Sequence, residues 1–250
     1  MSSSTAPQLA PEVMRLSEPQ RVINTFVAPS RTFIDIRNNA SWWMPWLLLS
    51  VMSMLFVFTM GQKVGWERIM QNEIAKNPRA VEQFDKMPAE QRDRAMDMQV
   101  TIGKVSGYMS PLILLISALL IAAVLMATFN FGIGATIGYK TALAIVFYGW
   151  LPSLVTSLLG MVTLYAGVDP DGFSIRNPVA TNPAYFMDVT QHKFLYGMAS
   201  ALDIIVIWSI VLMAIGFSSN SKVKRGTAFA VIFGWYIVVK LIGAGFASAF

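Results

Sequence analysis

Two long apolar runs at the end of the sequence, residues 194–217 and 227–250, constrain the fold most. Each is long enough to cross a bilayer as an α-helix, which needs about 20 residues. A short basic turn at 218–226 separates them, so we expect an antiparallel helical hairpin. Three earlier runs, at 42–60, 108–130 and 141–165, are similar in length and character. The sequence therefore predicts an all-α, polytopic integral membrane protein with five transmembrane helices.

Composition supports this class. Hydrophobic residues make up 55% of the chain and charged residues 13%, whereas soluble domains carry about 25% charged residues. The sequence has no cysteine, which excludes disulfides and thiolate chemistry. The net charge of +5 is distributed over several loops rather than gathered in one patch, which argues against nucleic acid as a partner and leaves the lipid bilayer as the predicted one.

Each run of the hairpin contains one charged residue, Asp203 in the first and Lys240 in the second. Their distances from the turn are nearly equal, so an antiparallel hairpin places them at similar depth. Since an unpaired charge at the bilayer centre costs at least about 2.5 kcal/mol, an ion pair is the simplest interpretation. Two alternatives stay open: a neutral Asp203 with Lys240 extending toward the interface, and a functional polar site.

The third run contains Pro152, which removes a helical hydrogen bond and predicts a kink near Tyr148. Such a kink either shapes the fold or lines a cavity. The glycine-rich stretch at 131–138 lacks the lysine and the preceding strand of a phosphate-binding loop, so it is predicted to be a tight turn.

Two segments outside the spans are expected to be helical. Residues 61–107 mix charged and apolar positions and predict two or three amphipathic helices in an extramembrane loop. Residues 1–41 have no apolar signal-peptide core and are predicted to be a cytoplasmic tail with a short basic amphipathic helix. That helix is expected to lie on the membrane face or to pack on the protein's own loops. Either segment offers a surface for a protein partner.

Catalytic and metal chemistry find little support. The turn at 169–172 lacks the further ligands of a calcium loop, and His192 is the only histidine. No nucleophile elbow or carboxylate dyad occurs within a span. We therefore expect a protein that is not an enzyme, with no cofactor, metal site or catalytic residue.

Orientation follows from the basic residues. The tail, Lys140 and the 218–226 turn carry bases close to the spans, where the positive-inside rule acts most strongly. The long first loop also carries bases and favours the opposite orientation. We expect the N-terminus in the cytoplasm and the C-terminus outside.

Several short motifs resemble the Yip family of five-span membrane proteins, the Ypt/Rab-interacting group, in its prokaryotic branch. Residues 27–33, VAPSRTF, are similar to the family's Pro-x-x-Thr-Phe segment, and residues 148–152, YGWLP, to its aromatic-Gly-x-x-Pro span. Asn182-Pro183, Asp203 and Trp208 fall in the most specific stretch. The resemblance implies five spans, a cytosolic N-terminus and a role linked to membrane traffic, here in a bacterial inner membrane. The eukaryotic Asp-Leu-Tyr-Gly-Pro motif does not occur.

Two functional hypotheses remain at this point. The first is a non-enzymatic membrane scaffold that organises protein partners or lipids. The second is a small transporter or channel that uses the polar site of Asp203 and Lys240 together with the kink at Tyr148 and Pro152. A water-filled path to Asp203 would distinguish the second from the first. The sequence does not predict the oligomeric state.

Overall fold

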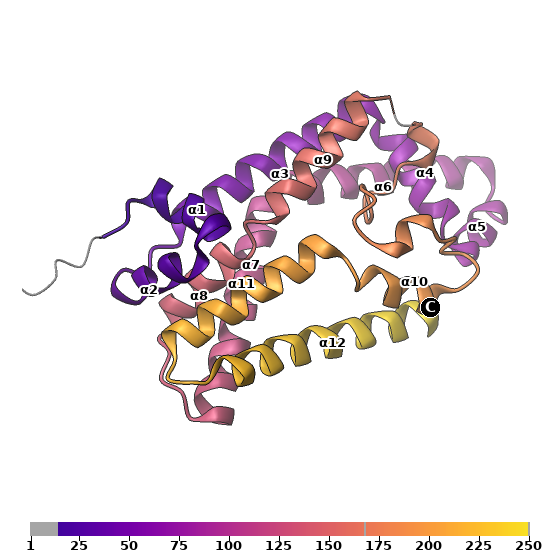
Figure 1. Ribbon diagram of the computed structural model, residues 1–250. Coiled ribbons are helices and arrows are strands. Elements are labelled where there is room, and N and C mark those ends of the chain that lie inside the picture. Colours follow the sequence, from indigo (N-terminus) through magenta and orange to yellow (C-terminus); the bar gives the residue numbers. More distant parts are fainter. Residues whose placement is uncertain (1–14, 168, 250) are drawn as a thin grey trace, which may run out of the picture.

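The computed structural model describes residues 15–167 and 169–249, which form helices joined by turns, with no strand among them. The first 14 residues of the predicted tail lie outside this part of the chain. The long helices lie side by side in one bundle (Figure 1). They are α3 (Trp43–Lys63), α7 (Ser110–Ala127), α8 (Tyr139–Gly149) followed by α9 (Ser153–Tyr165), α11 (Ile204–Asn220) and α12 (Arg225–Ala249). The predicted all-α membrane fold is confirmed.

Four described helical segments are long and apolar enough to cross a membrane, and a fifth crossing results if α10 (Lys193–Ser200) and α11 count as one span. These two helices meet at an angle of 52°. The arm at the start of the described chain and the C-terminus lie at opposite ends of the bundle (Figure 1), which fits an odd number of crossings. The span predicted over 194–217 is therefore broken just before Ile204.

The third span is also interrupted, at the position that Pro152 predicts. Helix α8 ends at Gly149 and α9 begins at Ser153, with Trp150, Leu151 and Pro152 in the turn between them. The freed backbone groups form shorter-range bonds, such as Ser153 N–H to the carbonyl of Trp150 at 3.0 Å. This local rearrangement is how a proline is accommodated where water is scarce.

Helix α11 occupies the centre of the bundle and packs against α2 (Pro29–Asn38), α8, α9 and α12. Ile205 and Leu212 on this helix are both buried. The segment before the first span contributes to these contacts, since Phe26 packs edge-on against Trp208. Gly216 permits one of these contacts: a Cβ atom there would lie 2.5 Å from Ile145 and 2.9 Å from the Phe33 ring.

Helix α12 is the most exposed of the long helices, as an outer span should be. Its buried positions are Ala228, Ile232 and Ala244, whereas Ile237 is 51% exposed.

The extramembrane loop forms three helices, which are α4 (Trp66–Ala75), α5 (Pro78–Asp85) and α6 (Ala89–Tyr108). Figure 1 places α4 and α5 at the end of the bundle opposite the arm. The segment between α9 and α10 contains the short helices η2 (Pro170–Gly172) and η3 (Pro183–Phe186). It lies over this same end, where Phe173 joins a small buried cluster with Met60 and Ile69.

The glycine-rich stretch forms a tight turn. It follows a π-helical turn, η1 (Thr128–Gly132), and Gly134 adopts a φ of 73°, which favours glycine. The Asn130 side chain closes the turn by bonding both backbone groups of Ile137, at 2.9 and 3.0 Å. A structural turn, rather than a phosphate-binding loop, is thus the arrangement observed.

The arm consists of α1 (Glu18–Val27) and α2 (Pro29–Asn38), which pack on each other and on α8 and α11. Phe33 and Ile36 are fully buried and belong to the main hydrophobic core. Of the two placements expected for the amphipathic segment, packing on the protein is thus observed, although on the spans rather than on the loops. The arm forms part of the bundle.

Candidate functional site

The arm is held by a polar group that we call the arm junction, made of Glu18, Arg21, Asp35 and Tyr148. Ser17 begins α1 with a capping box, in which it accepts a bond from Gln20 N–H and the Gln20 side chain accepts one from Ser17 N–H. This fixed start places Arg21 and Thr25, four residues apart, on the inner face of α1. These two polar residues therefore face the protein, beside Val22 and Phe26, which pack against the main core.

Arg21 is the centre of the arm junction. Its side chain is only 1% exposed, and its Nε lies 2.5 Å from Oδ2 of Asp35, which is 6% exposed. Its Nη1 lies 3.2 Å from Oε1 of Glu18. A buried charge is tolerated only when it is paired and hydrogen-bonded, so Arg21 depends on these two carboxylates. The pair joins α1 to α2 and fixes the angle between them.

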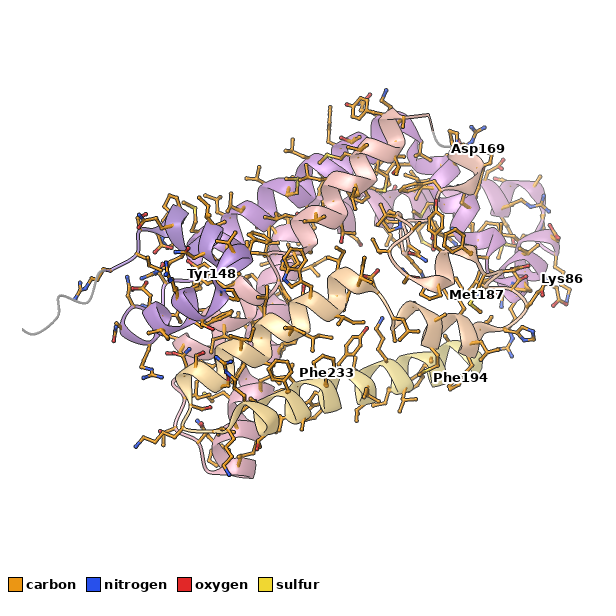
Figure 2. All side chains as sticks on the ribbon, viewed as in Figure 1. Lys86, Tyr148, Asp169, Met187, Phe194 and Phe233 are labelled. Carbon is orange, nitrogen blue, oxygen red and sulfur yellow. The ribbon has the colours of Figure 1, made fainter. Side chains whose placement is uncertain are left out.

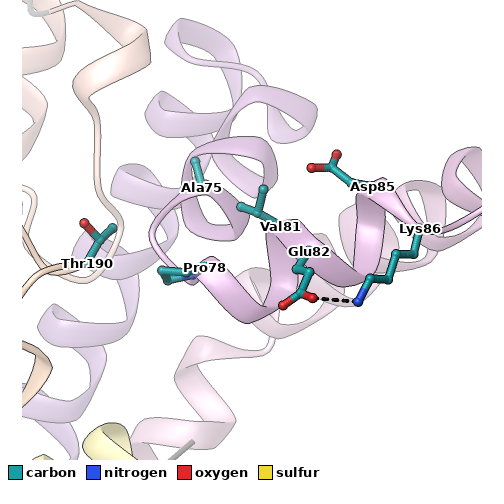
Figure 3. A pocket seen from close by; sticks show the side chains of 7 residues that line it. All are labelled: Ala75, Pro78, Val81, Glu82, Asp85, Lys86 and Thr190. Carbon is teal, nitrogen blue, oxygen red and sulfur yellow. Dashed lines mark hydrogen bonds and ion pairs between the residues drawn. The ribbon is translucent and has the colours of Figure 1, made fainter.

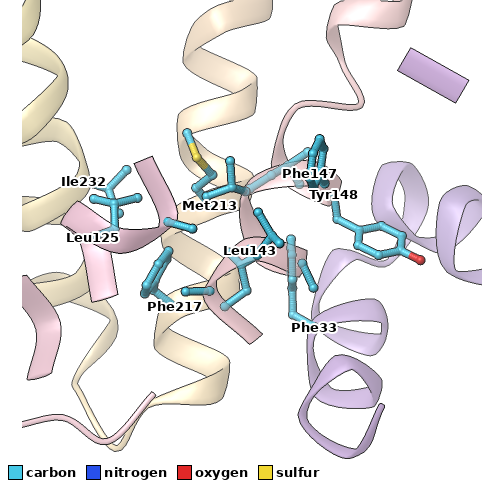
Figure 4. Close-up of a cluster of buried hydrophobic side chains, with 14 of the residues drawn as sticks. Phe33, Leu125, Leu143, Phe147, Tyr148, Met213, Phe217 and Ile232 are labelled. Carbon is cyan, nitrogen blue, oxygen red and sulfur yellow. The ribbon is translucent and has the colours of Figure 1, made fainter. Parts of the chain in front are cut away.

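Tyr148 connects the arm junction to the third span. It is fully buried near the end of α8, and its hydroxyl donates a 3.0 Å hydrogen bond to Oε2 of Glu18. In Figure 4 its ring extends from the hydrophobic cluster toward the arm, with the hydroxyl at the far tip. Figure 2 shows the same residue beside the arm helices. Tyr148 was predicted to mark a kink or a cavity, and here it joins the kinked span to the arm.

Asp203 belongs to a second polar group, at the break in the fourth crossing. Its Oδ1 accepts the backbone N–H groups of Ile205 and Val206, at 2.9 and 3.0 Å, and so caps α11. Its Oδ2 accepts the Thr181 hydroxyl at 2.5 Å and the Asn182 amide at 3.0 Å. We call Asp203, Thr181 and Asn182 the cap site. It attaches the segment between α9 and α10 to the start of α11.

Lys240 lies on α12, and the structure does not join it directly to Asp203. Among the described residues no ion pair within 4.0 Å links the two, and the contact of the Lys240 ammonium is with the Tyr236 ring, 5.7 Å from its centroid. The Tyr236 hydroxyl donates to the carbonyl of Ala201 at 2.8 Å, so α12 does reach the break. Any role of the two charges as an intramembrane pair stays a prediction.

No group of three or more potential metal ligands occurs in the part of the chain that the structure describes. A pocket of about 510 Å³ lies at the extramembrane end, lined by residues of α4 and α5 and by Thr190 (Figure 3). Glu82 and Lys86 form an exposed ion pair at its edge. Nearby, bonds from the side chain and backbone of Thr190 lower the pKa of Asp188.

Most of these polar residues were not predicted to be site residues. Glu18 and Arg21 lie in the segment predicted to be a basic amphipathic helix, and Asn182 was singled out only as part of a family motif. One signal was available: the Ser-x-x-Gln spacing at 17–20 marks a capped helix start, which fixes the face that Arg21 occupies. The burial of that face depends on α8 and α11, which no local pattern reveals.

Together, the bundle, its broken spans and its helix-joining polar groups define a polytopic helical membrane protein with a docked arm. The Yip1 domain model matches residues 23–247, so the chain belongs to the Yip1 domain family. That family is tied to vesicle trafficking and is generally non-enzymatic. A search of the curated proteins and one of the solved structures find no match. The resemblance drawn from the motifs is confirmed at the level of the family.

Proposed function

We propose that this chain is a membrane scaffold whose docked arm and extramembrane loop bind protein partners. The observation that carries the proposal is the outward face of the arm. The arm junction holds Arg21 on the inner face of α1, whereas Ile23 and Val27 are 61% and 72% exposed. These two residues are four apart and form one apolar strip on a helix that is fixed to the bundle.

We also propose that the chain belongs to the prokaryotic branch of the family and resides in a bacterial plasma membrane with its arm in the cytoplasm. The distribution of basic residues supports the orientation. The arm, the start of α8, which carries Lys140, and the turn between α11 and α12 lie at the same end of the bundle (Figure 1). Short basic segments next to the spans favour the cytoplasmic side. The cysteine-free chain allows a direct test, in which Val223→Cys should react with an impermeant thiol reagent only after lysis.

Site-specific photo-crosslinking tests the scaffold proposal. A photoreactive residue replaces Val27 on the arm or, as a matched control, Val239, which is 59% exposed on α12 and faces lipid. We expect a discrete protein crosslink in native membranes from position 27, lost when the arm junction is disrupted by Asp35→Asn, and only lipid adducts from position 239. Lipid adducts alone at both positions would rule out the arm as a partner surface.

Flux measurements in proteoliposomes distinguish the scaffold proposal from the transporter hypothesis. Asp203 is occupied by the helix cap and by Thr181 and Asn182, which gives it a structural role. We therefore expect wild type and Asp203→Asn to show the same background flux of protons or small solutes. A wild-type flux that Asp203→Asn abolishes would favour transport over the scaffold role.

A further inference from the structure

The outward face of α2 combines bases with an apolar residue. Arg31, Ile34 and Arg37 recur at intervals of three, so they lie along one side of the helix. All three are exposed, Ile34 by 54%, whereas Phe33 and Ile36 on the other side are buried in the core. A helix face with bases beside an apolar side chain is typical of contact with the headgroup region of a bilayer.

The turn between α11 and α12 extends this basic surface. Lys222, Lys224 and Arg225 are exposed there, and none of them forms an ion pair with another described residue. The guanidinium of Arg37 donates to the carbonyl of Ser219, so α2 and the turn are in direct contact. Because α11 and α12 belong to membrane-crossing segments, the turn that joins them lies next to the bilayer.

The acids at this end do not offset these charges. Glu18 and Asp35 are the acidic residues of the described arm, and both face Arg21 in the arm junction. Because both carboxylates are engaged in the arm junction, they do not neutralise the bases of the outward surface, which stays positively charged. The opposite end differs, since Lys86 pairs with Glu82 and Arg94 with Glu90.

We propose that the outward face of α2 and the turn at 218–226 form a binding surface for anionic phospholipids of the adjoining leaflet. The phosphates accept hydrogen bonds from the guanidinium and ammonium groups, and Ile34 contacts the acyl-chain boundary. Each base near a charged membrane surface strengthens association about fivefold. The proposal rests on the proposed scaffold function and names the class of lipid that the scaffold would organise. Lipid binding is measured on the purified protein, so its outcome does not depend on the protein partner proposed above.

Native mass spectrometry of the detergent-solubilised protein tests the surface. Phosphatidylglycerol and phosphatidylcholine are titrated separately, and the bound copies give the affinity for each. We expect wild type to prefer phosphatidylglycerol and the triple variant Lys222→Gln/Lys224→Gln/Arg225→Gln to lose affinity for it on the order of a hundredfold, at about fivefold for each base. Affinity for phosphatidylcholine should not change.

The matched control removes three exposed bases from the other end, Lys86→Gln/Arg94→Gln/Lys104→Gln. It should retain the wild-type preference, and inorganic phosphate should not displace the lipid because it lacks the acyl chains. Single variants, Arg31→Gln among them, keep the test usable if a triple variant unfolds. Equal binding of the two lipids by wild type, or an equal loss in the control, would overturn the proposal. Displacement by inorganic phosphate would overturn the assignment to lipid.

Discussion

Replacing Asp35 by Asn removes the main partner of a buried arginine. Arg21 is 1% exposed, and its Nε lies 2.5 Å from the Asp35 carboxylate. Breaking a buried pair on one side costs about 3–5 kcal/mol, because the remaining charge stays desolvated. Glu18 remains 3.2 Å from Arg21 and is 21% exposed, so it compensates in part. We therefore expect a loss near the lower limit, about 3 kcal/mol.

The loss should appear first as release of the arm. Since 1.4 kcal/mol corresponds to a tenfold change, about 3 kcal/mol raises the undocked population about a hundredfold. Limited proteolysis in detergent micelles measures this population as the cleavage rate between α1 and α2, while the bundle stays intact. Thermal unfolding of the same samples reports whether the spans are also weakened. Asp93→Asn, an exposed acid on α6, is the matched control and should leave both measurements unchanged.

The double variant Arg21→Gln/Asp35→Asn decides whether the pair itself is responsible. With both charges removed, the arm should recover part of its protection, giving a coupling energy above about 1 kcal/mol. If Asp35→Asn costs less than about 1 kcal/mol, or if the two single losses simply add, Arg21 is not a desolvated charge that depends on Asp35. The role of the buried Arg21 in docking the arm would then be refuted.

Two further substitutions test the contacts of the arm with the spans. Gly216→Ala should cost about 1–3 kcal/mol of unfolding free energy, because its Cβ would overlap Ile145 and Phe33. The control Gly234→Ala on α12 has open space around it and should be neutral or stabilising. Thermal unfolding compares the two variants, and equal effects would contradict the packing at Gly216. Tyr148→Phe removes the hydrogen bond to Glu18 and should lower the unfolding free energy by about 1.5–3 kcal/mol. The arm should then be cleaved faster in limited proteolysis, and an unchanged cleavage rate would contradict the link between Tyr148 and the arm.

The membrane class and the helices within residues 61–107 could be predicted because they depend on local patterns. Apolar runs of sufficient length define spans, and Pro152 alone is enough to place a helix break between Gly149 and Ser153. The break before Ile204 has no proline. It depends on Asp203 accepting bonds from Thr181 and Asn182, some twenty residues earlier. Such a distant partner leaves no periodic signal.

The arm was harder to predict for a related reason. Helical spacing in α1 defines two faces, and the usual rule assigns the apolar face to the interior. Val22 and Phe26 follow that rule and pack against the core, but Arg21 is buried beside them. Its burial is possible because two carboxylates neutralise it within the arm, and Tyr148 completes the bonding of Glu18. This arrangement requires α8 to lie beside the arm, so it is a property of the tertiary fold.

The cap site gives a final prediction about the two charged residues of the hairpin. An ion pair predicts that Asp203→Ala alone is more harmful than Asp203→Ala with Lys240→Ala. The observed bonds predict otherwise. Asp203→Ala should cost about 2–4 kcal/mol, because it removes a helix cap and two side-chain hydrogen bonds. Lys240→Ala should add its own small effect independently, within about 0.5 kcal/mol of additivity.

Unfolding of the two single variants and the double variant in detergent measures this coupling. Ser17→Ala, which removes the exposed cap of α1, serves as the control and should cost about 1 kcal/mol. Rescue of Asp203→Ala by Lys240→Ala would show that the two charges depend on each other in the membrane, and the structural account of Asp203 would then be wrong. Additivity instead assigns Asp203 to the joint between α10 and α11. The charge of Lys240 would then be independent of Asp203 and would interact with lipid or with the Tyr236 ring.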